Sequence, residues 1–453
     1  IERAARAAQA QGGDATFDGG AGDDRVAFSD STLAPSNSGA TLLGGLGDDL
    51  MSFEGGPVAT GGGDVSLRGG SGGDRFLFSG GDVAQGFGAL VEIRGGSGGD
   101  TLQIAGGAIG GFGTLDFSGE AGDDLVQLQG GAQIGTGLAQ QRFDGGAGND
   151  SLFIDDVTLA VTNGSDVLLQ GGLGDDRFDF GAAIVGLEGQ VSVLGGSGSD
   201  SFHFASTTTL APTSTGGATV SGDSGDDLFS GAGHFGDYPG YARLLGGAGR
   251  DNFSFTDAVL NSAEFLGEEG DDRIGLFGGS LGASAASTLG GDAGSDTLLL
   301  SDVAVVAGSL LGGDGDDTLD LASGTEITYA VIELGSGNDV LRLDDAVILG
   351  NPSVTDASGT DTLDLTGDGT GSFDAQPLAA FEALAKSGSG RWIVASDHGF
   401  AAGATIAEGT LEIAAGVQLL ADAGVLAAGR LEGLGTLAGS LTNGGTVAPA
   451  SDG

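Results

Sequence analysis

The sequence predicts an all-β fold: a right-handed parallel β-helix with about 24 residues per coil, one GGxGxD-type turn per coil and a short N-terminal helical cap. Three observations predict it. Fifteen aspartates recur at intervals of 21 to 27 residues, each follows a glycine-rich turn, and apolar residues alternate after each one. A repeat of this length is typical of stacked coils in which each coil contacts only its neighbours.

The fifteen aspartates, called the anchor aspartates below, close turns such as FDGGAGDD (17–24), LQGGLGDD (169–176) and LLGGDGDD (310–317). Because their spacing matches one coil, we expect one of them on the same corner of every coil. They are Asp24, Asp49, Asp74, Asp100, Asp124, Asp150, Asp176, Asp200, Asp227, Asp251, Asp272, Asp296, Asp317, Asp339 and Asp361.

Strands are predicted on both sides of each turn. Apolar residues occupy the second and fourth positions after an anchor aspartate, as in Val26 and Phe28 or Phe178 and Phe180. This period of two indicates a strand with one buried face. A second alternating stretch leads into each turn, and a third, more variable segment closes the coil. Three short strands and three corners suit coils that stack about 4.8 Å apart.

The chain is expected to have three parts. Residues 1–12 have helix-forming composition and are predicted to cap the apolar N-terminal end. Residues 13–370 are predicted to form a β-helix of about fifteen coils with metal-binding turns. After Asp361 the turn motif stops but strand and glycine patterning continues, so residues 371–453 are predicted to extend the β-helix without such turns.

Composition restricts the function classes. The chain has 63 acidic and 15 basic residues and a net charge of −48, which repels nucleic acid and anionic membrane surfaces. We therefore expect a cationic partner and no nucleic acid. Cysteine is absent, which excludes a disulfide scaffold and thiol catalysis. The chain begins at Ile1, and we expect it to be a processed or excised piece.

The turns themselves are candidate metal sites. Glycine permits positive φ, which directs backbone carbonyls to one side, and the anchor aspartate adds a carboxylate. Hard oxygen ligands at this density suit calcium, and a second turn about 4.8 Å away would complete the cage. We therefore expect multiple calcium ions in a column between adjacent coils, held by the fifteen anchor aspartates. If the turns bound nothing, like charges would stack about 5 Å apart along the whole column.

Further acids stand immediately before several anchor aspartates and are called the outer acids. The sequence leaves open whether they are ligands or solvated neighbours. They are Asp23, Asp48, Asp123, Asp175, Asp226, Asp271 and Asp316.

These turns resemble the RTX (hemolysin-type) calcium-binding repeat, in which GGxGxD precedes an alternating apolar residue. The resemblance implies a calcium-loaded parallel β structure in a secreted bacterial protein, with the anchor aspartates on calcium. RTX repeats follow one another roughly every nine residues, whereas this chain has one copy per coil, which implies a single calcium column along one edge. Copies such as VSGDSGDD (220–227) lack a glycine, and SVTDASGTD (353–361) departs furthest from the pattern.

The segment FEALAKSGSGRWIVASDHGFAAGATIAEGTLEIAAG (381–416) resembles the autotransporter-associated repeat near the end of type V passenger domains. The resemblance implies a passenger displayed at the bacterial cell surface or released outside the cell, with an outer-membrane barrel in the full-length chain. Such a passenger would be an adhesin, stalk or surface scaffold that folds on exposure to extracellular calcium. Its partner would be a host or neighbouring-cell molecule or a carbohydrate, and self-association is a further option.

No catalytic site is predicted. The one lysine, Lys386, and the histidines His203, His234 and His398 are scattered, and we expect them to be surface or turn residues. Two alternative functions stay open: an extracellular carbohydrate-active β-helix stabilised by calcium, and a self-assembling surface-layer protein. An irregular coil is expected at 230–243, and its residues His234, Tyr238, Tyr241 and Arg243 are the best candidate recognition spot.

Overall fold

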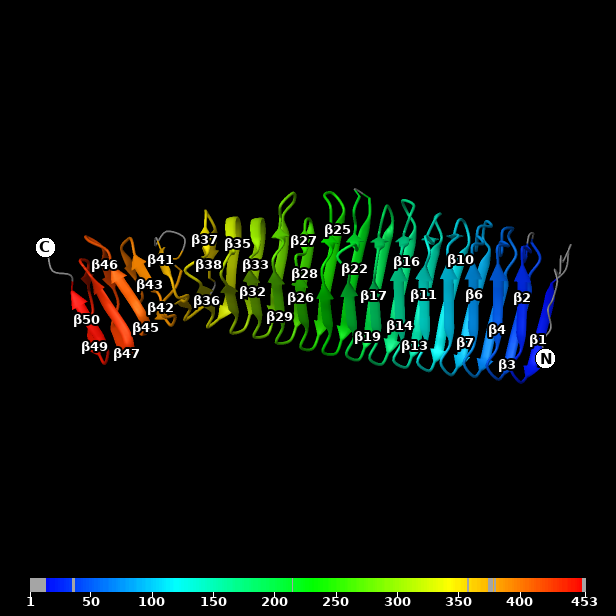
Figure 1. Ribbon diagram of the computed structural model, residues 1–453, viewed down its shortest axis with the longest axis horizontal. Coiled ribbons are helices and arrows are strands. Elements are labelled where there is room, and N and C mark those ends of the chain that lie inside the picture. The colour runs from blue at the N-terminus through cyan, green and yellow to red at the C-terminus, as the bar shows by residue number, and fades with distance from the viewer. Residues whose placement is uncertain are drawn as a thin grey trace. The chain divides into compact units, whose positions relative to one another are not determined.

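The structure, a computed structural model, describes residues 14–34, 37–213, 215–356, 358–373, 378 and 380–449. These residues form parallel strands stacked in coils of about 24 residues, and they contain no helix, so the predicted parallel β-helix is confirmed (Figure 1). The predicted helical cap at residues 1–12 lies outside the described residues. No described segment is a helix long and apolar enough to cross a membrane.

The chain divides into two compact units. Unit 1 comprises residues 1–248 and 261–263, and unit 2 comprises residues 249–260 and 264–453. The division falls within the stretch that carries the anchor aspartates, and each unit contains several of them.

In unit 1, one sheet holds the strands that follow the anchor aspartates. Each strand pairs in parallel with its equivalent in the next coil, so that Phe178 lies between Leu152 and Phe202. The strands are β2 (Arg25–Ser29), β4 (Leu50–Glu54), β6 (Arg75–Ser79), β8 (Thr101–Ala105), β11 (Leu125–Gln129), β14 (Ser151–Asp155), β17 (Arg177–Phe180), β20 (Ser201–Phe204) and β23 (Leu228–Gly231).

A second sheet of unit 1 holds the strands that lead into the turns and the short strands that close the coils. The leading strands are β1 (Ala15–Ala21), β3 (Ala40–Leu46), β5 (Val65–Ser71), β7 (Leu90–Ser97), β10 (Thr114–Ala121), β13 (Gln140–Ala147), β16 (Asp166–Leu173), β19 (Gln190–Ser197), β22 (Gly217–Ser224) and β25 (Tyr241–Ala248). The short strands are β9 (Ala108–Ile109), β12 (Gln133–Ile134), β15 (Val157–Leu159), β18 (Ala183–Val185), β21 (Thr209–Leu210) and β24 (His234–Phe235).

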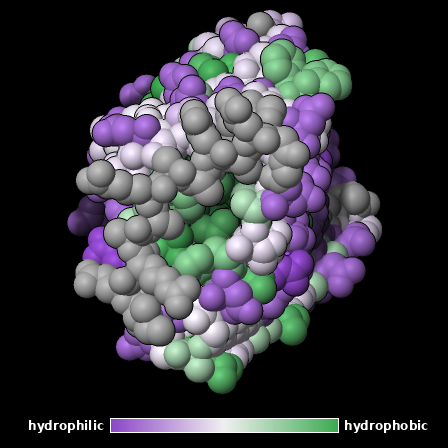
Figure 2. Space-filling view, turned by 90° about the vertical axis from the view of Figure 1, so that its right-hand side faces the viewer, coloured by the Kyte–Doolittle hydropathy of each residue, from purple (hydrophilic) through white to green (hydrophobic). Residues whose placement is uncertain are grey.

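The core of unit 1 consists of the inward residues of these strands. Viewed end-on, unit 1 shows apolar residues at its centre and hydrophilic residues around them (Figure 2). Because the coils are in register, equal positions stack: the rings of Phe178 and Phe202 lie 4.8 Å apart and those of Phe202 and Phe229 lie 4.7 Å apart. Gly231 interrupts this pattern opposite Phe204, and the buried ring of Phe235 packs edge-on against Phe204 there.

Unit 2 has the same plan with shorter coils. The strands that follow anchor aspartates are β26 (Asn252–Thr256), β29 (Arg273–Phe277), β32 (Thr297–Ser301), β34 (Thr318–Leu321), β36 (Val340–Leu343) and β40 (Thr362–Leu365). The other strands of these coils are β27 (Val259–Leu260), β28 (Ala263–Glu269), β30 (Ser280–Leu281), β31 (Ser287–Ala293), β33 (Ala304–Asp314), β35 (Glu326–Gly337), β37 (Ile348–Leu349), β38 (Ser353–Thr355) and β39 (Ser358–Gly359). Strand β33 pairs with both β30 and β31, because the shorter coil has lost the corner that separates two strands elsewhere.

Parallel pairing continues in unit 2 beyond the last anchor aspartate. These strands are β41 (Thr370–Phe373), β42 (Ala383–Lys386), β43 (Arg391–Val394), β44 (His398–Gly399), β45 (Gly403–Ile413), β46 (Gln418–Leu420), β47 (Ala423–Gly433), β48 (Thr436–Leu437), β49 (Leu441–Asn443) and β50 (Thr446–Pro449). The coils at residues 383–449 are called the C-terminal coils below.

Candidate metal centre

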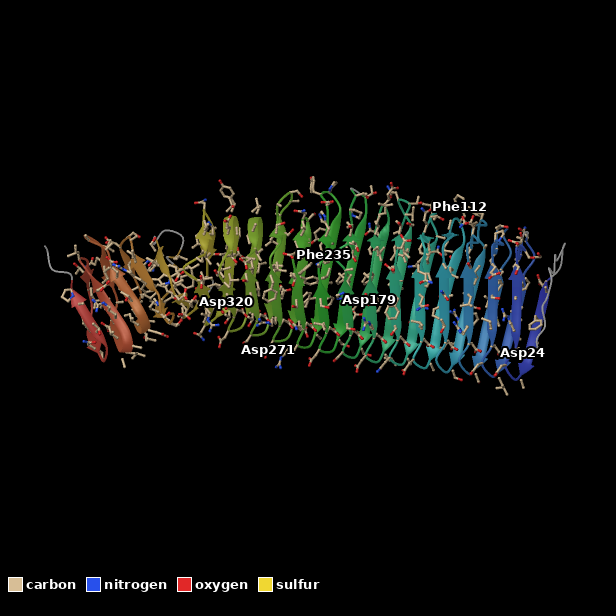
Figure 3. All side chains as sticks on the ribbon, in the orientation of Figure 1. Asp24, Phe112, Asp179, Phe235, Asp271 and Asp320 are labelled. Carbon is tan, nitrogen blue, oxygen red and sulfur yellow. The ribbon has the colours of Figure 1, made fainter. Side chains whose placement is uncertain are left out.

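The anchor aspartates lie at the corner between a leading strand and the strand that follows it. Each lies two positions before the next inward apolar residue, so the alternation of the strand directs its carboxylate into the coil. All fifteen are buried, with at most 8% of the residue exposed. Within unit 1, Asp24 lies at the opposite edge from the exposed Phe112 (Figure 3). Because the anchor aspartates are buried, their carboxylates form a column inside the β-helix.

Thirteen of the anchor carboxylates are bonded to the neighbouring coil through one oxygen. The Oδ1 atom of Asp176 accepts the backbone N–H of Asp150 at 2.7 Å, and the same bond recurs along both units at 2.6 to 2.8 Å. The sequence did not predict this ladder. It ends at Asp361, whose N–H donates to Oε2 of Glu382 at 3.0 Å. Glu382 thus takes the ladder position in the first coil without an anchor aspartate.

The second oxygen has no such bond. Oδ2 is buried without a hydrogen-bond partner at Asp49, Asp74, Asp100, Asp124, Asp150, Asp176, Asp200, Asp296, Asp317, Asp339 and Asp361. Unpartnered buried oxygens are costly, and eleven in equivalent positions indicate a missing counter-charge or proton.

The first glycine of each turn makes room for this oxygen. A Cβ atom added to Gly44 would lie 2.3 Å from Oδ2 of Asp49 and 2.6 Å from the carbonyl oxygen of Gly69 in the next coil. Gly195 faces Oδ2 of Asp200 and the next coil's carbonyl in the same way, at 2.1 and 2.7 Å. Glycine is required at this position because the carboxylate oxygen and the carbonyl oxygen of the next coil approach it too closely for a side chain. The two oxygens converge beside the glycine.

Burial changes the acidity of the column. Desolvation is the largest cause and raises the pKa of Asp124 to about 8, that of Asp176 to about 7 and that of Asp200 to about 6. The ladder bond opposes this shift, and neighbouring acids add to it. The carboxylates therefore demand neutralisation near neutral pH, by protons or by a cation. Carboxylate and carbonyl oxygens converge at the described corners of the column, and the chemistry of these hard donors fits calcium.

The outer acids form a second ladder that runs in the opposite direction. Oδ1 of Asp23 accepts the N–H of Asp48 in the following coil at 3.0 Å, and Oδ1 of Asp175 accepts that of Ser199 at 2.8 Å. These side chains are exposed, in contrast to the anchor aspartates. The geometry favours the solvated-neighbour interpretation of the two that the sequence left open.

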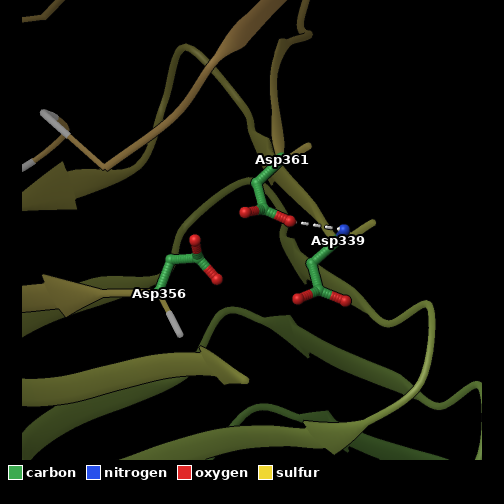
Figure 4. A group of neighbouring side chains, drawn as sticks. All are labelled: Asp339, Asp356 and Asp361. Carbon is green, nitrogen blue, oxygen red and sulfur yellow. Dashed lines mark hydrogen bonds between the residues drawn. The ribbon is translucent and has the colours of Figure 1, made fainter. Parts of the chain in front are cut away.

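One group of three carboxylates stands out among the described residues. Asp339, Asp356 and Asp361 place ligand atoms within 4.8 Å of one another (Figure 4). Asp339 and Asp361 were predicted ligands, but Asp356 was missed. It occupies the first-glycine position of the irregular turn SVTDASGTD (353–361), five residues before its anchor, and this position is the signal that would have identified it.

The scattered basic residues are not brought together. Lys386 and His398 are buried, with 0% and 8% exposure, so the expectation of surface or turn positions is wrong for both. The Lys386 ammonium donates to the Gly388 carbonyl, and burial lowers the pKa of Lys386. His398 packs on the ring of Phe400, with 4.3 Å between ring centroids. These contacts are structural.

The candidate recognition spot lies in unit 1 around β24 and β25. Nε2 of His234 is 3.1 Å from Oδ1 of Asp237, and Tyr238 is 75% exposed. Tyr241 is 37% exposed. The recognition spot thus consists of two exposed tyrosines next to the contact between the His234 imidazole and the Asp237 carboxylate.

Comparison with family models gives no match, and comparison with curated proteins gives none either. The resemblances to RTX repeats and to autotransporter passengers rest on the motifs quoted above.

Proposed function

We propose that this chain is a non-catalytic, calcium-binding β-helix that serves as an adhesin, stalk or scaffold at a bacterial surface, as the passenger part of a longer protein. The observation that carries the proposal is the internal column of carboxylates whose Oδ2 atoms are buried and unpartnered. Calcium is the cation whose ligand preferences match buried carboxylate and carbonyl oxygens.

Neutralisation by protons alone is the weaker explanation. Burial raises the pKa of Asp74 to about 6, that of Asp100 to about 7 and that of Asp124 to about 8, so at neutral pH protons would neutralise such carboxylates only in part. A net charge of −48 also opposes a compact chain unless cations are bound. Extracellular calcium-binding modules work at about 10⁻⁴ to 10⁻³ M calcium. The fold would therefore close outside the cell, where such concentrations are found.

The outer faces support a non-catalytic role. Arginines there are engaged with neighbouring acids: Arg94 contacts Glu92 at 3.0 Å and Asp116 at 2.7 Å, and Arg142 contacts Asp144 at 2.6 Å. Arg94 joins adjacent strands through Asp116, whereas the pairs with Glu92 and Asp144 lie within one strand. Such pairs stabilise a sheet surface, and they engage these two arginines with acids so that neither is offered to an anionic polysaccharide.

A cavity in unit 2 also argues against glycoside hydrolysis. Its volume is about 740 Å³, and its walls include Trp392, Phe373 and Asp345. Asp345 is the one acid among its described lining residues, whereas glycosidases ordinarily use a pair of carboxyl groups.

The test is calcium removal from the full chain. We expect a chelator to abolish most of the β signal in circular dichroism, and added calcium to restore it. Unchanged signal and melting temperature would contradict the proposal.

A matched pair of variants locates the ions. Asp176→Ala should lower the number of bound calcium ions measured by atomic absorption after dialysis, because it removes a buried Oδ2. Asp175→Ala removes the adjacent exposed carboxylate and should leave that number unchanged. If Asp176→Ala binds as many calcium ions as Asp175→Ala, the anchor carboxylate is not a calcium ligand and the proposed column is refuted.

A further inference from the structure

We propose that Asp339, Asp356 and Asp361 form a separate cation site that binds a hard divalent ion more tightly than the rest of the column. The inference extends the proposed calcium binding, but it does not depend on the other coils being filled. It begins from an exception to the turn motif.

Asp356 stands where most turns have their first glycine. In those turns a side chain at this position would point at the anchor carboxylate: a Cβ on Gly291 would lie 2.2 Å from Oδ2 of Asp296, and one on Gly312 would lie 2.6 Å from Oδ2 of Asp317. An acid here adds a carboxylate to the internal column itself. The same placement of an uncharged residue is seen at Leu334, which precedes Asp339 by five residues and is buried.

The three carboxylates converge. Asp339 and Asp361 are both 0% exposed, and their Oδ2 atoms are buried without a hydrogen-bond partner. Oδ1 of Asp356 is likewise buried and unpartnered. The ladder uses only Oδ1 of the two anchors, which accept the N–H groups of Asp317 and Asp339 at 2.8 and 2.7 Å. Each of the three aspartates therefore keeps one buried oxygen without a partner, and one carboxylate oxygen of each lies within 4.8 Å of the others.

No counter-charge from the described part of the chain balances this cluster. None of the three aspartates makes an ion pair with a described lysine or arginine. The elements around it add further acid, since Glu382 accepts the N–H of Asp361. Charge count and rigidity of oxygen ligands set calcium affinity. Three carboxylates on an ordered corner should therefore bind more tightly than coils in which glycine replaces the third.

The experiment uses the full chain, stripped of metal and titrated with calcium in a calorimeter. We expect two classes of calcium-binding site: one high-affinity site at the three aspartates, called the tight class, and several low-affinity sites in the other coils, called the weaker class. Asp356→Asn, which keeps the side-chain volume, should weaken the tight class by about 100-fold and leave the weaker class unchanged. Circular dichroism of each calcium-loaded variant would establish that it folds.

Glu333→Gln is the control, because Glu333 is an exposed acid on β35 opposite Thr355, and its loss changes net charge equally. It should leave both classes intact. The inference is overturned if Asp356→Asn binds calcium as the unmodified chain does. It is also overturned if the unmodified chain lacks a tight class and Asp356→Asn only stabilises the metal-free fold, because the cluster then shares protons. A tight class without a weaker one would support the inference and refute the calcium column.

Discussion

Unit 2 contains two kinds of coil on one plan. From Asp251 to Asp361 each coil buries an anchor aspartate, whereas in the C-terminal coils the buried polar side chains among described residues are Lys386 and His398. Acids at the corners of the C-terminal coils are exposed, and Asp397 and Asp422 each accept a backbone N–H at 2.7 Å. The difference teaches that coil geometry by itself does not require a buried anion, so the anchor aspartates need a further explanation, which the proposed calcium binding supplies.

Metal removal should separate the two kinds of coil most strongly. After chelation, hydrogen exchange followed by mass spectrometry should show loss of protection in β26 to β40, because unneutralised carboxylates repel there. Protection in β42 to β50 should be retained in larger part, because those coils bury apolar residues without acids. Equal loss of protection in β26 to β40 and in β42 to β50 would show that the two kinds of coil do not differ in their dependence on metal.

Acid should partly replace the metal. The folded pKa values of Asp296 and Asp317 are raised by burial to about 6 and about 7, above the ordinary 3.8. The folded state then binds more protons than the unfolded state, so the free energy of unfolding of metal-free protein should fall as pH rises from about 4 to 8. Urea denaturation in chelator at pH values across this range measures it. Stability that rises with pH would contradict the shift.

Gly291→Ala should destabilise the calcium-loaded protein by about 2 to 4 kcal/mol, because its Cβ would lie 2.2 Å from Oδ2 of Asp296. Gly424→Ala in the C-terminal coils is the matched control, since nothing lies within 4 Å of its Cβ. It should change stability by less than about 0.5 kcal/mol. Chemical denaturation compares the two, and similar losses would show that the corner is not sterically special.

Asp296→Asn should have the smallest effect. Asparagine keeps the ladder oxygen that accepts the N–H of Asp272 and removes the buried charge, so metal-free stability should rise by about 1 kcal/mol. The stabilisation gained on adding calcium should fall. Asp316→Asn, at an exposed outer acid, should change neither. Thermal melts with and without calcium measure both quantities, and an unchanged calcium effect would remove Asp296 from the ligand set.

The strands and the common corner were predictable because period-two alternation and a fixed repeat are local signals. Phe178 and Asp176 needed only their neighbours in sequence to be placed. The direction of the ladder was not predictable, because the bond from Asp150 to Asp176 depends on the register between coils. Lys386 and His398 were misplaced since a single polar residue on an inward position carries no periodic signal. Asp356 was missed because its turn lacks the first two glycines of the motif.

The two ladders also bear on how such a chain changes length. The anchor ladder reaches back to the preceding coil and the outer ladder reaches forward, as at Asp176 and Asp175. The anchor donors and acceptors therefore match wherever one coil with an anchor aspartate is joined to another, whereas the outer ladder needs an acid, Asn or Ser at its position. Recombination that duplicates or deletes a complete coil preserves the anchor bond at the junction, whereas a one-residue insertion in a turn breaks the register of both ladders. Length can evolve in steps of a single coil, and the β-helix can be shortened or extended by design in the same steps.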